Sequence, residues 1–195
     1  MRTIKFPTAA CGLVLAAASL FLLPACSLNV KKGQNGEEKQ VDIKTPMGGI
    51  HVTKAPDPQE VGIPIYPGAK QKDKDSDGDD KSANVNISGF GYGLKVVALQ
   101  YESADAPDKV VAYYKDQLKK YGNVLVCHTT HLDVDSDIKD HGSSHELTCE
   151  GSKGVNIELK VGTKENQHIV AIEPKGEGSS FSLVYVRTHG KDTDI

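Results

Sequence analysis

The segment VNIELKV (residues 155–161) alternates apolar and polar side chains without interruption. Successive side chains of a β-strand point to opposite faces of its sheet. The four apolar side chains therefore share one face, while Asn156, Glu158 and Lys160 share the other. This pattern is typical of antiparallel sheets that are covered on one side, whereas strands buried on both sides are apolar throughout. The segment therefore predicts an antiparallel sheet whose apolar face is covered by another element.

A helix that supplies this cover is predicted within SADAPDKVVAYYKDQLKKYG (residues 103–122). We expect Asp105 to be its N-cap and Gly122 to end it, while Pro107 lies in the first turn, where a missing N–H costs nothing. The apolar residues that recur at helical spacing are Val110, Tyr114, Leu118 and Tyr121. One apolar stripe of this kind suits a helix that packs across a sheet.

Most of the remaining chain is predicted to be strand. The further strand segments are NVNIS (84–88), LKVVALQYE (94–102), NVLVCHTTH (123–131), HELTCEG (145–151), HIVAIEP (168–174) and FSLVYVRTH (181–189). The short connections between the last strands contain Gly, Ser, Asn or Glu, which indicates antiparallel hairpins. Two shorter alternating runs, 41–43 and 50–52, flank a Pro/Gly turn and predict a small hairpin.

The expected fold class is α+β, with a curved antiparallel sheet of about five to seven strands and one amphipathic helix packed on it. The small hairpin precedes this sheet. The stretch after the hairpin holds four prolines, Pro56, Pro58, Pro64 and Pro67, and we expect it to be extended rather than helical.

The first residues predict export. Arg2 and Lys5 precede an apolar run over residues 8–23, and Leu23-Pro24-Ala25-Cys26 follows. This arrangement resembles the signal peptide and lipobox of bacterial lipoproteins. The resemblance implies that residues 1–25 are removed and that Cys26 becomes a lipidated N-terminus, since stable anchoring takes more than one acyl chain. Ser27 resembles the family's outer-membrane sorting pattern. Ordinary secretion, with Cys26 incidental, is the alternative.

The expected organisation is a signal peptide over 1–25, a flexible tether over 26–40, a hairpin with its Pro-rich connection over 41–60, and an α+β domain over 61–195. The domain resembles an uncharacterised family of bacterial exported domains. The matching segments are 65–69 (IYPGA), 110–114 (VVAYY) and 162–170 (GTKENQHIV). This resemblance implies a fold and a location, but no activity.

Charge argues against a nucleic-acid partner. The chain has 23 Lys and Arg against 26 Asp and Glu. Removing the signal peptide takes away two basic residues and no acidic one, which leaves 21 against 26. The basic residues neither outnumber the acidic ones nor gather in a stripe. The expected partners are the membrane, through the lipid anchor, and another envelope protein.

The two cysteines that remain, Cys127 and Cys149, predict a disulfide in an exported chain. If they face each other across antiparallel strands, His131 lies opposite His145 on the same face. Two imidazoles so placed would begin a zinc site, with Asp133 or His141 as a third ligand. The alternative is a pair of exposed histidines at a hairpin mouth.

A second metal hypothesis concerns DKDSDGDD (residues 73–80). Asp73, Asp75, Asp77 and Gly78 follow the order that opens a calcium loop, and Asp79 adds a further carboxylate. Position 12 is Asn84, where an EF-hand needs Glu, and the flanks are proline-rich or strand. The EF-hand is thereby excluded. Weak calcium binding and a solvated acidic turn remain as alternatives.

No catalytic motif of the G-x-S-x-G or H-E-x-x-H type occurs. Gly89, Gly91 and Gly93 lie between two predicted strands, so a hairpin tip is favoured over a phosphate-binding loop. The leading hypothesis is a lipid-anchored binding or interaction module of the cell envelope, in the outer membrane and facing the periplasm, with no cofactor and no enzymatic activity. The alternatives are a metal-responsive module that binds calcium or zinc weakly, and a hydrolase with an unrecognised site.

Overall fold

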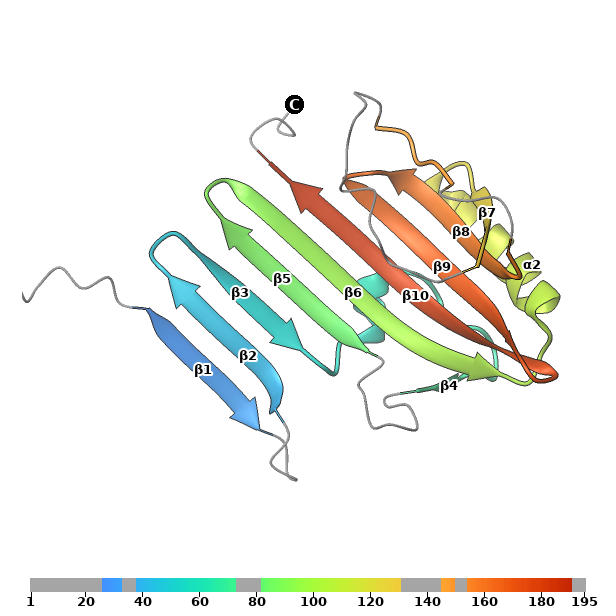
Figure 1. Cartoon of the computed structure of the whole chain (residues 1–195), viewed down its shortest axis with the longest axis horizontal. Helices are drawn as coiled ribbons and strands as arrows, with labels where there is room; N and C mark the ends of the chain where they lie inside the picture. Colours follow the sequence, from blue (N-terminus) through green and yellow to red (C-terminus); the bar gives the residue numbers. More distant parts are fainter. Residues whose placement is uncertain (1–25, 33–37, 73–81, 131–144, 150–153, 191–195) are drawn as a thin grey trace, which may run out of the picture.

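The computed structural model describes residues 26–32, 38–72, 82–130, 145–149 and 154–190. They form one antiparallel sheet of ten strands with a single α-helix packed on it (Figure 1). The α+β fold and the curved antiparallel sheet are confirmed. The strand number exceeds the expected five to seven, because residues near the N-terminus also join the sheet.

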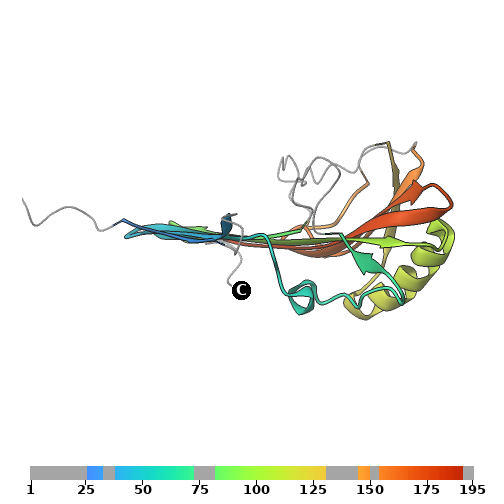
Figure 2. The same ribbon diagram turned by 90° about the horizontal axis from the view of Figure 1, so that it is seen from below.

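The C-terminal half of the sheet has the strand order β6-β10-β9-β8-β7. The bounds are Tyr92–Ser103 for β6, Leu125–Thr129 for β7, Asn156–Thr163 for β8, Asn166–Lys175 for β9 and Gly178–His189 for β10. Helix α2, Pro107–Leu118, covers one face of this half (Figure 2). In β8, Leu159 and Val161 are fully buried in the core beneath this helix, as the alternation of VNIELKV predicts.

The helix presents its predicted stripe to the sheet, and Val110, Tyr114 and Leu118 are 0% exposed. Its N-cap is Ala106, without a side-chain cap. The Asp105 carboxylate instead accepts hydrogen bonds from the Tyr66 hydroxyl at 3.0 Å and the Lys109 ammonium at 2.7 Å. The predicted cap is therefore wrong, because Tyr66 and Lys109 occupy the carboxylate of Asp105.

A 3₁₀ turn, η3 (Lys119–Tyr121), continues α2, and the chain leaves it at Gly122 as predicted. Gly122 has φ 136°, a conformation that other residues rarely adopt. The helix therefore ends where the sequence places its end.

The proline-rich segment contains a second 3₁₀ turn, η2 (Pro58–Val61), although an entirely extended chain was expected. Asp57 caps the turn by accepting the Gln59 N–H at 2.9 Å, and proline suits the first position of such a turn. Figure 2 shows η2 and α2 on the same side of the sheet. Val61, Ile63 and Tyr66 of this segment are buried in the core. The short strand β4, Lys70–Gln71, then pairs with β6.

The N-terminal half has the order β1-β2-β3-β5-β6, with β1 at Ser27–Lys32, β2 at Glu38–Thr45, β3 at Gly48–Thr53 and β5 at Ala83–Gly89. The predicted hairpin is present as β2 and β3, with Val41 opposite Val52. It is part of the main sheet, because β3 also pairs with β5. Figure 2 shows these strands as one thin layer extending away from the helix.

Strand β1 stands where the tether over 26–40 was expected. Leu28 lies opposite Ile43, and Val30 lies opposite Val41. The two apolar residues are spaced by two, the strand period, and β2 offers an apolar neighbour to each. Polar composition alone suggested a tether because it does not reveal this cross-strand match.

His168 on β9 lies in a pocket of aromatic rings at the end of η3. Its ring stacks on Tyr121, with centroids 4.0 Å apart and planes 19° from parallel, and Tyr185 lies 4.9 Å away. Burial lowers the pKa of His168 to about 4, and the nearby Lys120 ammonium acts in the same direction. The imidazole is therefore neutral at pH 7.

This pKa predicts an acid-sensitive stability. The unfolded chain, with a histidine pKa of 6.5, binds more protons than the folded chain between pH 6.5 and about 4. The contribution of the neutral ring is complete above pH 6.5, and up to about 3 kcal/mol is lost as the pH falls to 4. Urea denaturation at several pH values measures this. His168→Phe keeps the stacking and is expected to flatten the slope; an unchanged slope would contradict the assignment.

Candidate binding surface

The single-layer half of the sheet has one apolar face. Period-two alternation in each strand, together with the strand register, brings these side chains to the face opposite α2. We call this set the apolar sheet face; its members are Leu28, Val30, Val41, Ile43, Ile50, Val52, Val85, Ile87, Leu94 and Val96.

These residues form two continuous cross-strand rows. The Leu/Ile row runs from Leu28 across β2, β3 and β5 to Leu94, and the Val row runs in parallel from Val30 to Val96. None of the ten is buried by the described part of the chain, and Leu28 is 68% exposed. Cross-strand pairing of β-branched side chains stabilises the sheet. It does not remove the face from water.

The opposite face of the same strands is polar. Asn29, Asp42, His51, Asn86 and Lys95 form a row across it in the same register. Lys95 pairs with Glu60 of η2 at 2.8 Å. This half of the sheet is thus amphipathic, with a hydrogen-bonded polar face on the α2 side and an apolar face on the other.

The polar face contains an Asp–His pair. Asp42 and His51 meet across β2 and β3, with Oδ1 and Nδ1 2.5 Å apart. The hydrogen bond with His51 lowers the pKa of Asp42, and Gln40 adds a second hydrogen bond. Ser88 borders the same shallow cavity of about 370 Å³. No hydrogen bond among the described residues joins it to His51, so the nucleophile–base contact of a hydrolase is not seen there.

The apolar face continues to the tips of two hairpins at one end of the sheet. Met47, in the β2–β3 turn, is 66% exposed; Phe90, in the β5–β6 turn, is 72% exposed; and Tyr92 is 63% exposed. The two turns are in contact, because the Phe90 N–H donates a hydrogen bond to the Met47 carbonyl at 3.3 Å. We call these three residues the apolar tips.

An open cavity of about 400 Å³ lies between the apolar tips and the Leu/Ile row. Its lining includes Ile43, Ile50 and Leu94, together with backbone at glycines of both hairpins. None of the residues that line it carries a charge. Because the cavity is apolar and open, it suits a hydrocarbon chain better than a polar ligand.

Phe90 has an unusual backbone conformation for an aromatic residue. Its φ is 55°, the only positive value for a residue other than glycine in the part of the chain that the structure describes, and Gly91 follows with 85°. Two positive φ values define a type I′ turn, which favours Asn-Gly, Asp-Gly or Gly-Gly. A bulky side chain there is strained. Local turn preference therefore does not account for phenylalanine.

Cys26, the predicted lipidation site, lies at the same end of the sheet. It is exposed, and β1 begins at the next residue. Ser27 pairs with Lys44, close to the turn that carries Met47 (Figure 1). The apolar tips are therefore within about 20 Å of Cys26, at roughly 4.8 Å per strand. Lipidation itself remains a prediction.

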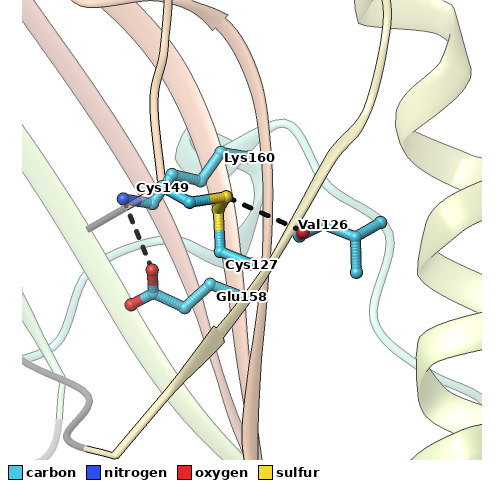
Figure 3. Close-up of a disulfide and its surroundings, with 5 residues drawn as sticks. All are labelled: Val126, Cys127, Cys149, Glu158 and Lys160. Carbon is cyan, nitrogen blue, oxygen red and sulfur yellow. Dashed lines mark hydrogen bonds and ion pairs between the residues drawn. A yellow bond between two sulfur atoms is a disulfide. The ribbon is translucent and has the colours of Figure 1, made fainter. Parts of the chain in front are cut away.

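The predicted disulfide between Cys127 and Cys149 is present, with the Cα atoms 5.3 Å apart. The predicted hairpin around it is wrong. Residues 145–149 form no strand, and Cys127 lies opposite Glu158 of β8. The segment 145–149 lies on the face of the sheet away from α2 (Figure 2), and Figure 3 shows Cys149 of this segment bonded to Cys127. Strand β7 pairs with β8 instead, and residues 145–149 are joined to it through the disulfide rather than through a strand ladder.

Beneath this crossing segment lies a half-hidden ion pair. Glu158 and Lys160 of β8 are 3.4 Å apart, with side chains 12% and 11% exposed (Figure 3). The polar side of VNIELKV is thus covered as well, by the segment that the disulfide holds. Removing either partner would leave an uncompensated charge beneath this segment, which would destabilise the protein.

The zinc hypothesis loses its geometric basis. The His131–His145 alignment assumed that the two cysteines lie on paired strands, and they do not. His145 is exposed, and its Nδ1 lies 2.8 Å from the Glu165 carboxylate. His131, Asp133 and His141 lie outside the described residues.

The calcium hypothesis is untested, because Asp73, Asp75, Asp77 and Asp79 also lie outside the described residues. Among those described, no group of three His, Cys, Asp or Glu side chains is arranged to hold a metal ion. Calcium binding stays a prediction.

The sequence contained the signal for the apolar sheet face, but its meaning was missed. The runs 41–43, 50–52 and 84–88 alternate just as VNIELKV does, but the sequence predicts only a small hairpin and a strand there, not a shared apolar face. Alternation identifies an apolar side. It does not say whether another element packs against that side.

The described part of the chain has no helix long and apolar enough to cross a membrane. Comparison of the whole chain with models of protein families, with curated proteins and with solved structures finds no significant match.

Proposed function

We propose that this protein is a lipid-anchored interaction module of the cell envelope, and that it binds through the apolar sheet face. The observation that carries the proposal is the double row of aliphatic side chains, on a single-layer sheet, that no described part of the chain buries. The face is five strands wide, and each strand contributes two side chains to it. It therefore measures roughly 24 Å by 13 Å, or about 300 Å². The largest apolar patch on a monomer is commonly of this size and often has a binding function.

Energetics supports the same conclusion. Burying apolar surface is worth about 25 cal/mol per Å², so covering this face would contribute several kcal/mol to binding. The polar face of the same strands carries hydrogen bonds and ion pairs suited to water. A sheet with this asymmetry gains nothing from leaving its apolar side in solvent.

The anchor supports the location. The lipobox-like segment ends at Cys26, which leaves no linker before β1. A lipid at this position would fix the single-layer half, and not the helix-covered half, close to the membrane. Mass spectrometry of the mature N-terminal peptide tests this step, since an unmodified N-terminus would contradict the anchor.

The binding surface predicts protection in the cell. Ile50→Cys and Ile87→Cys place thiols in the apolar sheet face, where the native residues are 38% and 39% exposed. If a partner covers the face, a membrane-impermeant maleimide should label them several-fold more slowly in intact envelopes than in the purified, unacylated protein that carries Cys26→Ser.

Val155→Cys is the matched control, because Val155 is also an exposed apolar residue, at 76%, but lies outside this face. We expect it to react at the same rate in both preparations. Equal labelling of all three positions in envelopes would contradict the proposal.

A further inference from the structure

We infer that the partner of the apolar sheet face is the lipid bilayer itself, with the apolar tips inserted into its interfacial region. This inference rests on the proposed function, since it names what that surface binds. It also makes a separate claim, namely that Met47, Phe90 and Tyr92 contact lipid.

The first argument is position. Cys26 and the two hairpin turns lie at one end of the sheet, and no linker separates Cys26 from β1. An acyl anchor at Cys26 would therefore bring this end, and not the opposite one, to the membrane surface. The most exposed apolar side chains of the single-layer half are Leu28 and the apolar tips, close to where lipid would be.

The second argument is the strained turn. A type I′ turn with phenylalanine at its first central position is less stable than one with the preferred Asn, Asp or Gly. The Phe90 side chain is also 72% exposed, so it gains little packing within the protein that would compensate. Side chains in unfavourable backbone conformations concentrate at sites where the residue has a binding role. A projecting aromatic ring gains free energy when it leaves water for the bilayer interface, which offsets the strain.

The third argument is chemistry. The tips combine an aliphatic thioether, a phenyl ring and a phenol, and tyrosine suits the boundary between hydrocarbon and headgroups. The uncharged cavity of about 400 Å³ beside them can receive an acyl chain. An amphipathic element at a membrane surface turns its apolar face to lipid and its polar face to water. The two faces of this sheet are divided in that way.

A second copy of the chain fits less well. Two copies packed sheet against sheet would bury the aliphatic rows, with the sheets about 10 Å apart. Met47 and Phe90 belong to turns beyond the last paired residues, so such a dimer would leave these two side chains in water. A bilayer covers both the rows and the tips.

Tryptophan fluorescence tests the contact, because the chain has no native Trp. Phe90→Trp puts a single reporter at the tip, and Val155→Trp puts one at an exposed apolar position elsewhere. The processed protein is reconstituted into phosphatidylcholine vesicles, with and without bromine on the acyl chains. We expect blue-shifted, bromine-quenched emission from position 90 and unquenched emission from position 155.

Phe90→Asn provides a loss-of-contact variant that should still fold, because Asn-Gly is the preferred type I′ sequence. Its thermal midpoint is expected to equal or exceed that of the parent. In unacylated chains carrying Cys26→Ser, its partition into phosphatidylcholine vesicles should fall at least about tenfold. Val155→Asn should partition like the parent.

The outcomes separate the inference from the proposed function. An unmodified N-terminus with quenching at position 90 after vesicles are added would refute the anchor and leave the lipid contact standing. An acylated N-terminus without quenching at position 90 would overturn the inference. Protection of Ile50→Cys in the same preparation, with a dimer in sedimentation, would assign the face to a second copy.

Discussion

Replacing Phe181 by alanine is expected to destabilise the protein by about 3–5 kcal/mol, the range for deleting a buried aromatic ring. Phe181, on β10, is 1% exposed. Its ring lies 5.7 Å from that of Tyr101, 5.6 Å from Tyr114 and 6.2 Å from Tyr66. It therefore joins the sheet, the helix and the proline-rich segment in one cluster.

The rigidity of these neighbours explains why the cavity would persist. The Tyr66 N–H donates to the Tyr114 hydroxyl at 3.0 Å, and the Tyr66 hydroxyl donates to Asp105. The rings are thus held by hydrogen bonds and are not free to move into the space. Collapse of the surroundings, which lowers the cost of such substitutions, is restricted.

Chemical denaturation measures the loss, and Phe90→Ala is the matched control. It deletes the same ring at a position that is 72% exposed, so we expect a change within about 0.5 kcal/mol. Equal effects of the two substitutions would show that the aromatic cluster is not the centre of the core.

Removing the disulfide is expected to cost about 3 kcal/mol. The bond joins residues 22 apart in sequence, and closing a loop of this length in the unfolded chain accounts for that magnitude. The double substitution Cys127→Ala, Cys149→Ala also releases the segment that covers Glu158 and Lys160. The pair would become more exposed but would stay paired, so it should add little to the loss.

Thermal denaturation with and without reductant checks this prediction. The reductant should lower the midpoint of the parent and leave the double variant unchanged. If the parent were insensitive to complete reduction, the crossing segment would be held by other contacts, and its contribution to stability would have to be reassigned.

The fold was predictable where local pattern and long-range pairing agree. VNIELKV and the hairpin at 41–52 alternate with the period of two that is typical of strands. The apolar stripe at 110–121 has the spacing of a helix. HELTCEG (145–151) has a similar local character, yet residues 145–149 form no strand. Local character does not decide which segments pair: β7 pairs with β8, while residues 145–149 are tied to β7 by the disulfide and not by a strand ladder.

The candidate site was less predictable for a related reason. Whether an apolar row is covered depends on the whole chain. The same alternation places Leu159 under a helix and leaves Ile50 in solvent, because α2 spans only the C-terminal half of the sheet. The strain at Phe90 was likewise hidden, since it follows from a two-residue turn whose length is fixed only by the register of β5 and β6.

The place of β10 in the sheet determines the order in which the structure is completed. This strand, the last described in the sequence, pairs with β6 on one side and β9 on the other. The contact between Ser103 and Ser179 spans most of the C-terminal half of the chain. Contacts so distant in sequence form slowly, because a large loop must close before they contribute. During synthesis, no strand pairing can join the β1–β6 ladder to the β7–β9 ladder until β10 arrives.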